Sequence, residues 1–225
     1  MSEMYERNVV VLYKSGAFKV DLENPFTLRS GFKSPFYLQC ADIQNDPALY
    51  RGALEDMNAL VRGVVDPETF DRVSGGETRD WIFSIPLALT YLNKPHVMIR
   101  KKATDHGVGG RLITTINEGE RLIHVADLRT SGTSEVQDWI PTIREAGGII
   151  DHSFSYVDRL QGGLEALGEL DPPVQGHSVV PLGSFEEFFR IGLEAGQMER
   201  REYESLCEYA KDPEGWRNRW TESHR

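Results

Sequence analysis

Residues 122–134 have the side chains of a phosphate-binding loop. An apolar run of strand-like length ends at Asp127, a loop of small and hydroxyl residues follows, and a helix-like pattern begins at Glu135. Backbone N–H groups of such a loop converge on an anion, hydroxyls add donors, and the helix N-terminus adds partial positive charge. Asp127 is placed beside the loop to hold a sugar hydroxyl or a hydrated cation. The alternative is an ordinary strand-to-helix turn capped by Ser or Thr. The residues expected to hold the anion are Thr130, Ser131, Gly132, Thr133 and Ser134.

Two further loops carry cations after predicted strands. A short strand over residues 70–73 leads into the glycine loop 74–80, where Arg79 can meet a phosphate or, alternatively, pair with Asp80. Another strand, over residues 96–99, leads into a glycine-rich loop that can close over an anionic substrate and exclude water. A solvated basic hairpin is the alternative for that loop. Its cationic residues and histidine include Arg100, Lys101, Lys102 and His106.

The remaining candidates suit a flat, acidic ring. Residues 26–38 alternate like two short strands around a Ser-Gly turn, which brings Arg29 near aromatic residues that include Phe36. Arg159 follows a predicted strand over residues 149–157. At that end of a strand in an open parallel sheet, a guanidinium is placed to pair with a carboxylate. The alternatives are a solvated hairpin tip and a salt-bridge arginine.

Strand and helix patterns alternate from about residue 46 to 182. The helix over residues 46–65 has Asp46 as its cap and Pro47 in its first turn. Other helical patterns cover residues 4–20, with a break near Ser15, and residues 81–92, 135–146 and 185–210. The alternation predicts an α/β fold with a mostly parallel central sheet flanked by helices. We expect one domain over residues 1–225, with a C-terminal helical extension from about residue 185.

Composition excludes several classes of partner. The formal net charge is −10, from 35 acidic and 25 basic residues, and no long basic cluster offsets it, which argues against nucleic acid. The sequence has no apolar run of membrane-spanning length and no signal-peptide pattern, so we expect a cytoplasmic protein without a membrane partner. Cys40 and Cys207 lie far apart without metal-ligand spacing, which predicts packing roles.

Four segments in this order resemble the type I phosphoribosyltransferases, and within them the orotate phosphoribosyltransferases. Residues 26–36 are similar to the family's orotate-side segment, and residues 100–110 to its catalytic loop. Residues 127–133 are similar to its signature for 5-phosphoribosyl-1-pyrophosphate (PRPP), and Asp158-Arg159 matches a further motif. The resemblance is distributed from Leu12 to about Phe188.

The resemblance implies a type I phosphoribosyltransferase fold with a small hood formed by N-terminal segments. It implies transfer of ribose 5-phosphate from PRPP to orotate, release of pyrophosphate, a role in pyrimidine nucleotide biosynthesis, and a homodimer that shares its active sites. Mg²⁺ would be the cofactor, without direct protein ligands. By similarity, the catalytic residues are Asp127, His106, Lys101 and Arg100; PRPP is bound by Asp127, Thr130, Ser131, Gly132, Thr133, Ser134, Arg79 and Lys102; and orotate is bound by Arg29, Phe36, Thr130 and Arg159.

Three positions depart from the family pattern. Ala126 stands where the signature has the first of two acids, and Thr104 stands where the mobile loop has a further lysine. The segment before Ile85 lacks the lysine of the pyrophosphate loop. Each lost charge is expected to cost about 10²-fold in rate, with Arg79 and Lys102 available to compensate. Two other readings therefore stay open: a phosphoribosyltransferase with a different acceptor, and a non-catalytic regulatory protein that binds PRPP or a nucleotide.

Overall fold

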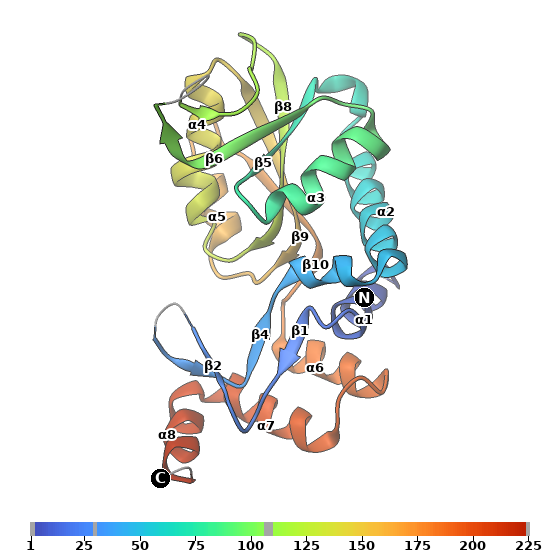
Figure 1. The fold of residues 1–225 in the computed structure, drawn as a ribbon, viewed down its shortest axis with the longest axis vertical. Helices are drawn as coiled ribbons and strands as arrows, with labels where there is room; N and C mark the ends of the chain where they lie inside the picture. The colour runs from blue at the N-terminus through green and yellow to red at the C-terminus, as the bar shows by residue number, and fades with distance from the viewer. Residues whose placement is uncertain (1–2, 29–30, 106–109, 224–225) are drawn as a thin grey trace. The chain divides into compact units, whose positions relative to one another are not determined.

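The computed structural model describes residues 3–28, 31–105 and 110–223 (Figure 1). The chain divides into two compact units. One, here called the sheet unit, comprises Arg51–Pro181. The other, here called the terminal unit, comprises Met1–Tyr50 and Leu182–Arg225. The sequence expectation of a single domain stays a prediction.

A six-stranded sheet forms the centre of the sheet unit. Its strand order is β10-β9-β8-β5-β6-β7, and neighbouring strands are parallel except for β7, which pairs antiparallel with β6. The predicted mostly parallel sheet is therefore confirmed. The strand bounds are β5 (Arg72–Gly76), β6 (His96–Thr104), β7 (Gly110–Leu112), β8 (Arg121–Arg129), β9 (Ile149–Asp158) and β10 (Gln175–Pro181).

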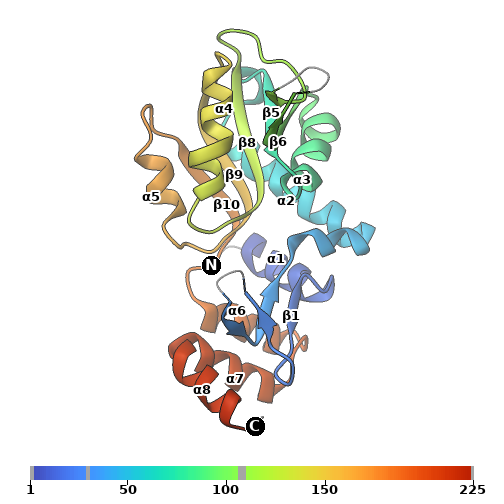
Figure 2. The ribbon, with the colours of Figure 1, turned by 60° about the vertical axis from the view of Figure 1, so that its left-hand side comes forward.

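Helices cover both faces of this sheet. Residues 51–64 of α2 and helix α3 lie on one face, and α4 and α5 lie on the other (Figures 1 and 2). Helix α2 begins as predicted, because the Asp46 carboxylate accepts hydrogen bonds from Ala48 N at 2.9 Å and Leu49 N at 3.1 Å. The bounds are α2 (Pro47–Val64), η2 (Pro67–Thr69), α3 (Asp80–Pro86), η3 (Leu87–Leu92), η4 (Glu135–Trp139), α4 (Ile140–Glu145) and α5 (Gly163–Gly168).

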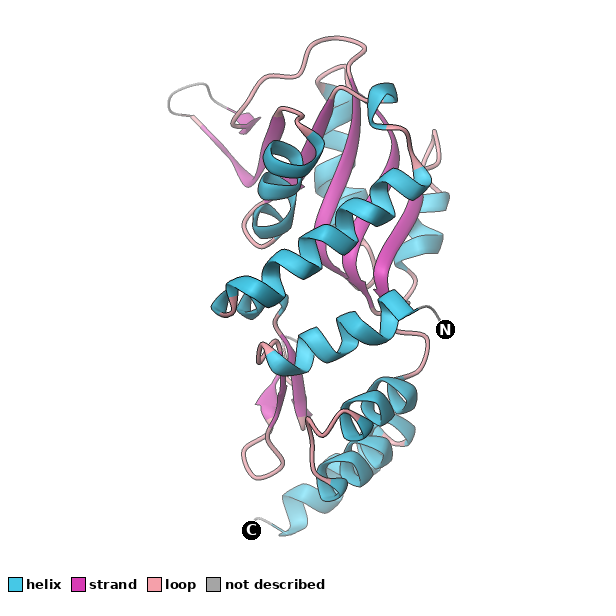
Figure 3. Cartoon of the chain, turned by 90° about the vertical axis from the view of Figure 1, so that its right-hand side faces the viewer, coloured by secondary structure: helices cyan, strands magenta, loops and turns pink. Residues whose placement is uncertain are grey.

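The core of the sheet unit lies where helices pack on the strands (Figure 3). Trp139, Ile140 and Ile143 from the η4–α4 segment are buried against residues of three strands and of the α5 region. Burying such side chains stabilises the unit by roughly 1.5–3 kcal/mol each. The strand and α5-region members of this cluster are Val97, Ile99, Leu122, Ile150, Leu167 and Val174.

Strand β8 is longer than its apolar pattern predicts. The prediction that the strand ends at Asp127 is wrong, because Leu128 and Arg129 continue the ladder opposite Val157 and Asp158 of β9. A charged residue is tolerated inside the strand since buried carboxylates surround the Arg129 guanidinium. Asp127 is therefore a strand residue, and only 6% of its surface is exposed.

The terminal unit is built around aromatic side chains. Tyr13, Phe18 and Phe36 pack with Phe188 and Phe189, with ring centroids 4.8–6.0 Å apart. N-terminal and C-terminal segments thus share one core. The bounds are α1 (Glu3–Lys14), β1 (Phe18–Val20), β2 (Phe26–Thr27), β3 (Lys33–Ser34), β4 (Phe36–Leu38), η1 (Cys40–Asn45), α6 (Phe185–Glu194), α7 (Arg200–Lys211) and α8 (Pro213–Ser223).

The predicted hairpin over residues 26–38 is confirmed for residues 26–27 and 33–34, whereas residues 36–38 pair outside it with Phe18–Val20, a strand where the end of the helix over residues 4–20 was predicted. Strand β2 pairs antiparallel with β3, and β1 pairs antiparallel with β4. The predicted helix over residues 185–210 is interrupted between Glu194 and Arg200, which separates α6 from α7. Cys40 and Cys207 are both buried and neither forms a disulfide among the described residues, which agrees with the predicted packing roles. Within the described ranges, no helix combines the length and the hydropathy needed to span a bilayer.

Candidate active site

The loop after β8 presents hydroxyl groups to solvent. Ser131, Thr133 and Ser134 are exposed, and the Ser131 and Thr133 hydroxyls are hydrogen-bonded to each other at 2.8 Å. Gly132 has a φ of 68°, a conformation that glycine adopts without strain. Its carbonyl accepts a hydrogen bond from Val136 N at 2.9 Å, which joins the loop to the first helical turn. This arrangement suits an anion that takes several donors at once.

The loop over residues 130–134 is here called the hydroxyl loop. A second glycine lets it pack against the loop before α5. A Cβ atom on Gly163 would lie 2.7 Å from the Thr130 carbonyl oxygen and 2.7 Å from the Arg129 side chain. A Cβ atom on Gly132 would lie 3.2 Å from the Gly163 backbone. Both positions are therefore restricted to residues without a side chain, and the two loops support each other.

The buried Arg129 side chain supports the hydroxyl loop by binding residues on either side of it. Its side chain is fully buried and forms ion pairs with Glu135, at 2.9 Å, and with Asp158, at 3.0 Å. It also donates to the Ser153 hydroxyl at 3.0 Å. Burial alone would raise the pKa of Glu135, but the Arg129 guanidinium more than offsets this and lowers it. One arginine thus ties the start of the helix, the end of β9 and the middle of β9 together.

Asp127 and Asp80 form an acidic pair at the end of β8. Asp127 N donates to Asp80 Oδ1 at 3.3 Å, and Gly76 N donates to Asp80 Oδ2 at 3.0 Å. Burial, and then the neighbouring Asp80 carboxylate, raises the pKa of Asp127 to about 7, although the Arg79 charge acts in the opposite direction. Asp80 was missed as a site residue because it lies 47 positions from Asp127 in the sequence.

Two buried histidines lie behind this pair. His124 is hydrogen-bonded to the Ser74 hydroxyl at 3.1 Å, and its Nε2 lies 3.7 Å from Asp80 Oδ2. His96 is hydrogen-bonded to the Ser84 hydroxyl at 2.8 Å, and burial followed by the His124 charge lowers its pKa to about 4. His96 is therefore neutral near pH 7 and is hydrogen-bonded through Nε2, whereas its buried Nδ1 has no partner among the described residues.

The prediction that a loop begins at Arg100 is wrong, because β6 continues to Thr104, and this strand is hydrogen-bonded to the segment that follows β5. Lys101 N donates to the Glu77 carboxylate at 2.8 Å, and Arg100 donates to the Thr104 hydroxyl at 2.9 Å. The side chains of Lys101 and Arg79 are exposed, as is that of Lys102. Thr104 is therefore hydrogen-bonded to a residue of its own strand, β6. His106 lies outside the described residues.

The residues predicted to bind a flat acidic ring are found in both units. Arg159 follows β9 in the sheet unit, is half-buried, and donates its backbone N–H to the Arg129 carbonyl at 2.9 Å. Phe36 lies in the terminal unit, where it is 6% exposed and packs among other aromatic rings. Arg29 lies outside the described residues. The Arg159 backbone therefore lies beside the last residue of β8, whereas a role for Phe36 stays a prediction.

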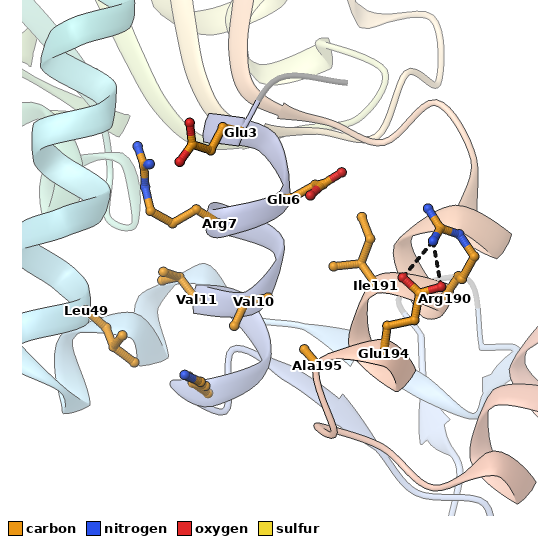
Figure 4. A pocket seen from close by; sticks show the side chains of 11 residues that line it. Glu3, Glu6, Arg7, Val10, Val11, Leu49, Arg190, Ile191, Glu194 and Ala195 are labelled. Atoms are coloured by element: carbon orange, nitrogen blue, oxygen red, sulfur yellow. Dashed lines mark hydrogen bonds and ion pairs between the residues drawn. The ribbon is translucent and has the colours of Figure 1, made fainter.

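The terminal unit has a pocket of its own, of about 480 Å³, lined by α1 and α6 together with Leu49 (Figure 4). Charges of both signs border it, including Arg7 and the ion pair between Arg190 and Glu194. The described site residues of the sequence analysis do not line this pocket. In the parts of the chain that the structure describes, no group of three or more His, Cys, Asp or Glu side chains forms a metal site.

Comparisons with known proteins identify the fold and the family. The chain is 30% identical to orotate phosphoribosyltransferase from Roseobacter denitrificans over 169 residues, 74% of each chain. It is 29% identical to the Ruegeria enzyme of that name over 92% of this chain and 89% of the relative. The crystal structure of orotate phosphoribosyltransferase from Aeropyrum pernix superposes with a TM-score of 0.68 and 27% identity, over 85% of this chain and 99% of that one.

No model of a known protein family matches the chain. The pairwise identities and the shared fold nevertheless cover most of its length. The chain therefore belongs to the orotate phosphoribosyltransferase family, and it is an enzyme of the phosphoribosyltransferase type.

Proposed function

We propose that this enzyme transfers ribose 5-phosphate from PRPP to orotate and releases pyrophosphate, in the cytoplasmic synthesis of pyrimidine nucleotides. The observation that carries the proposal is the hydrogen bond of 2.9 Å from Arg159 N to the Arg129 carbonyl. This hydrogen bond links Arg159, the residue proposed to bind the base, to Arg129 at the end of β8, and the hydroxyl loop follows Arg129. A donor phosphate and an acidic base can therefore be bound at neighbouring strand ends.

The hydroxyl loop would hold the 5-phosphate of PRPP. Ser131, Thr133 and Ser134 expose their hydroxyls, and the helical segment that begins at Glu135 adds partial positive charge. Asp127 would accept hydrogen bonds from the ribose hydroxyls. Because the loop is supported by the buried Arg129 and by Gly163, it is held in place before the ligand arrives, which lowers the entropy cost of binding.

Arg159 would pair with the carboxylate of orotate. A planar guanidinium can donate two parallel hydrogen bonds to a carboxylate, and uracil offers no such group. Thr130 joins the proposed base site by family resemblance, and the roles of Arg29 and Phe36 stay predictions. Orotate should therefore be preferred over uracil by the contacts of Arg159 alone.

Departure of pyrophosphate requires neutralisation of negative charge. Arg100, Lys101 and Lys102 supply cations on β6, Arg79 supplies one on the hydrogen-bonded segment after β5, and His106 completes the set by resemblance. Mg²⁺ would neutralise part of the pyrophosphate charge when bound. By family resemblance, the oxygens of PRPP and water would hold the metal. We include in the proposal a homodimer in which these cationic segments contribute to the active site of the neighbouring subunit.

The test is orotate-dependent release of pyrophosphate from PRPP and Mg²⁺, with uracil and adenine as competing acceptors. Arg159→Leu should lower kcat/KM for orotate by about 10²-fold, since it removes a charge-assisted hydrogen-bonded pair, and should leave the PRPP dissociation constant nearly unchanged. Arg51→Leu, at an exposed arginine on α2, is the matched control. Equal rates with uracil and orotate in the parent enzyme would contradict the carboxylate assignment.

A further inference from the structure

Two histidines face each other at the edge of the central sheet. His152 lies in β9 and His177 in β10, the last strand in the sheet order, and both residues are half-buried. Gln175 pairs with His152, and His177 pairs with Phe154, so alternation along the parallel strands puts both imidazoles on one face of the sheet. They lie in the first half of each strand, whereas the proposed active site gathers at the carboxyl ends. The pair is therefore separate from that site.

The nitrogen atoms of the two rings are spaced like those of a chelate. His152 Nδ1 lies 3.2 Å from His177 Nε2. With metal–nitrogen bonds of about 2.0–2.1 Å, nitrogens at this separation subtend an angle of about 100° at a metal ion, between the angles of octahedral and tetrahedral coordination. A metal ion could therefore be bound with little movement of either ring. The alternative is a hydrogen bond in which one nitrogen donates and the other accepts.

Neighbouring groups hold the His177 ring in place. The ring stacks on Phe154 with the centroids 5.0 Å apart. The His177 carbonyl accepts hydrogen bonds from the Arg129 guanidinium and from the Ser155 hydroxyl, each at 3.4 Å. Burial, followed by the charges of His152 and Arg129, lowers the pKa of His177, so this ring is neutral at pH 7. A neutral imidazole is the form that binds metal ions, so the ring needs no deprotonation first.

We propose that His152 and His177 bind one divalent transition metal ion of the class that favours imidazole, such as Zn²⁺ or Cu²⁺. His152 Nδ1 and His177 Nε2 would be the protein ligands, with the ring protons on His152 Nε2 and His177 Nδ1. Since the pair supplies two ligands, water would fill the remaining coordination positions. The ion would join β10 to β9 and would stabilise the sheet unit, because the unfolded chain does not hold the two rings together.

Calorimetric titration of the protein with Zn²⁺, in the absence of PRPP and Mg²⁺, tests the site. Loss of a group that only supports a metal ligand already costs about 10–100-fold in affinity, so His152→Gln and His177→Gln should each weaken Zn²⁺ binding by at least about tenfold. His224→Gln, which changes a histidine of the C-terminal segment, is the control and should leave the affinity unchanged. Zn²⁺ should also raise the urea midpoint of the parent but of neither ligand variant.

Pulsed electron paramagnetic resonance of the parent with bound Cu²⁺ counts the coordinated imidazoles directly. The proposal predicts two imidazoles in the parent and one in each of His152→Gln and His177→Gln. Because the decisive spectrum is that of the parent, the test holds even where a variant fails to fold. Fewer than two imidazoles in the parent would overturn the proposal, as would a Zn²⁺ affinity that neither variant weakens, and the pair would then be a hydrogen bond alone.

Discussion

Replacing Arg129 by Met should destabilise the sheet unit strongly. The substitution preserves much of the side-chain volume but removes the guanidinium that pairs with both Glu135 and Asp158. Among the described residues, no other cation forms an ion pair with either carboxylate. Both carboxylates are buried, so each would be left without its counter-charge. Breaking a buried ion pair from one side costs about 3–5 kcal/mol. For a unit of this size, that free energy corresponds to a fall in midpoint temperature of about 10–20 °C.

Urea unfolding followed by the fluorescence of the buried Trp139 measures this effect in the sheet unit. The matched control is Arg72→Met, because Arg72 also pairs with a carboxylate, Glu120, at 2.7 Å, but both side chains are 19% exposed. Solvent screening should limit the cost there to about 1 kcal/mol. Combining Arg129→Met with Glu135→Gln should recover part of the loss, since one buried charge is removed.

An Arg129→Met variant whose free energy of unfolding lies within about 1 kcal/mol of the parent's would contradict a buried ion-pair role for Arg129. A larger loss of stability in Arg72→Met than in Arg129→Met would contradict it as well. A strongly destabilised Arg129→Met that still binds phosphate with parental affinity at low temperature would refute a separate point, the support that Arg129 gives to the hydroxyl loop.

Three further changes test other parts of the account. Burial and the Asp80 carboxylate raise the pKa of Asp127 to about 7, so the folded protein binds this proton more tightly than the unfolded chain does. The free energy of unfolding should therefore fall as pH rises from about 4 to about 7. Asp127→Asn should reduce that fall, as measured by urea titrations at a series of pH values. Thr104→Lys should raise turnover about tenfold without lowering the PRPP dissociation constant, because the added charge stabilises departing pyrophosphate. The control Thr104→Val only removes the hydroxyl that accepts a hydrogen bond from Arg100 and should leave turnover no higher. Gly163→Ala should cost about 1–3 kcal/mol and weaken phosphate binding, since its Cβ would lie 2.7 Å from neighbouring atoms, whereas Gly168→Ala has open space and should do neither.

Local patterns predicted the elements that position the site. The start of α2 at Asp46-Pro47 was predictable because an Asx cap and an N-terminal proline act within one turn of helix. The hydroxyl loop between β8 and η4 was predictable for the same reason, since its residue types and the flanking apolar patterns are contiguous. Parallel pairing followed from the alternation of strands and helices, but the strand order did not, because it depends on contacts between distant segments.

The residues that sequence reasoning missed are those whose partners lie far away in the chain. Asp80 was interpreted as a partner of Arg79, whereas its carboxylate accepts from Gly76 and Asp127. Arg129 attracted no interpretation, since a single arginine after an apolar run gives no sign of a buried partner 29 residues away, at Asp158. Polar groups in a core are stabilised only by such pairing, which a local pattern does not contain.

Identification of the product tests the central claim most directly. The enzyme would be incubated with Mg²⁺, orotate and PRPP that carries ¹³C in its ribose, and the nucleotide fraction would be examined by mass spectrometry. The account predicts orotidine 5′-monophosphate with the label in its sugar, formed in equal amount to pyrophosphate and reduced by Arg159→Leu. Pyrophosphate release that does not depend on orotate, or a labelled nucleotide that forms equally well from uracil, would contradict it.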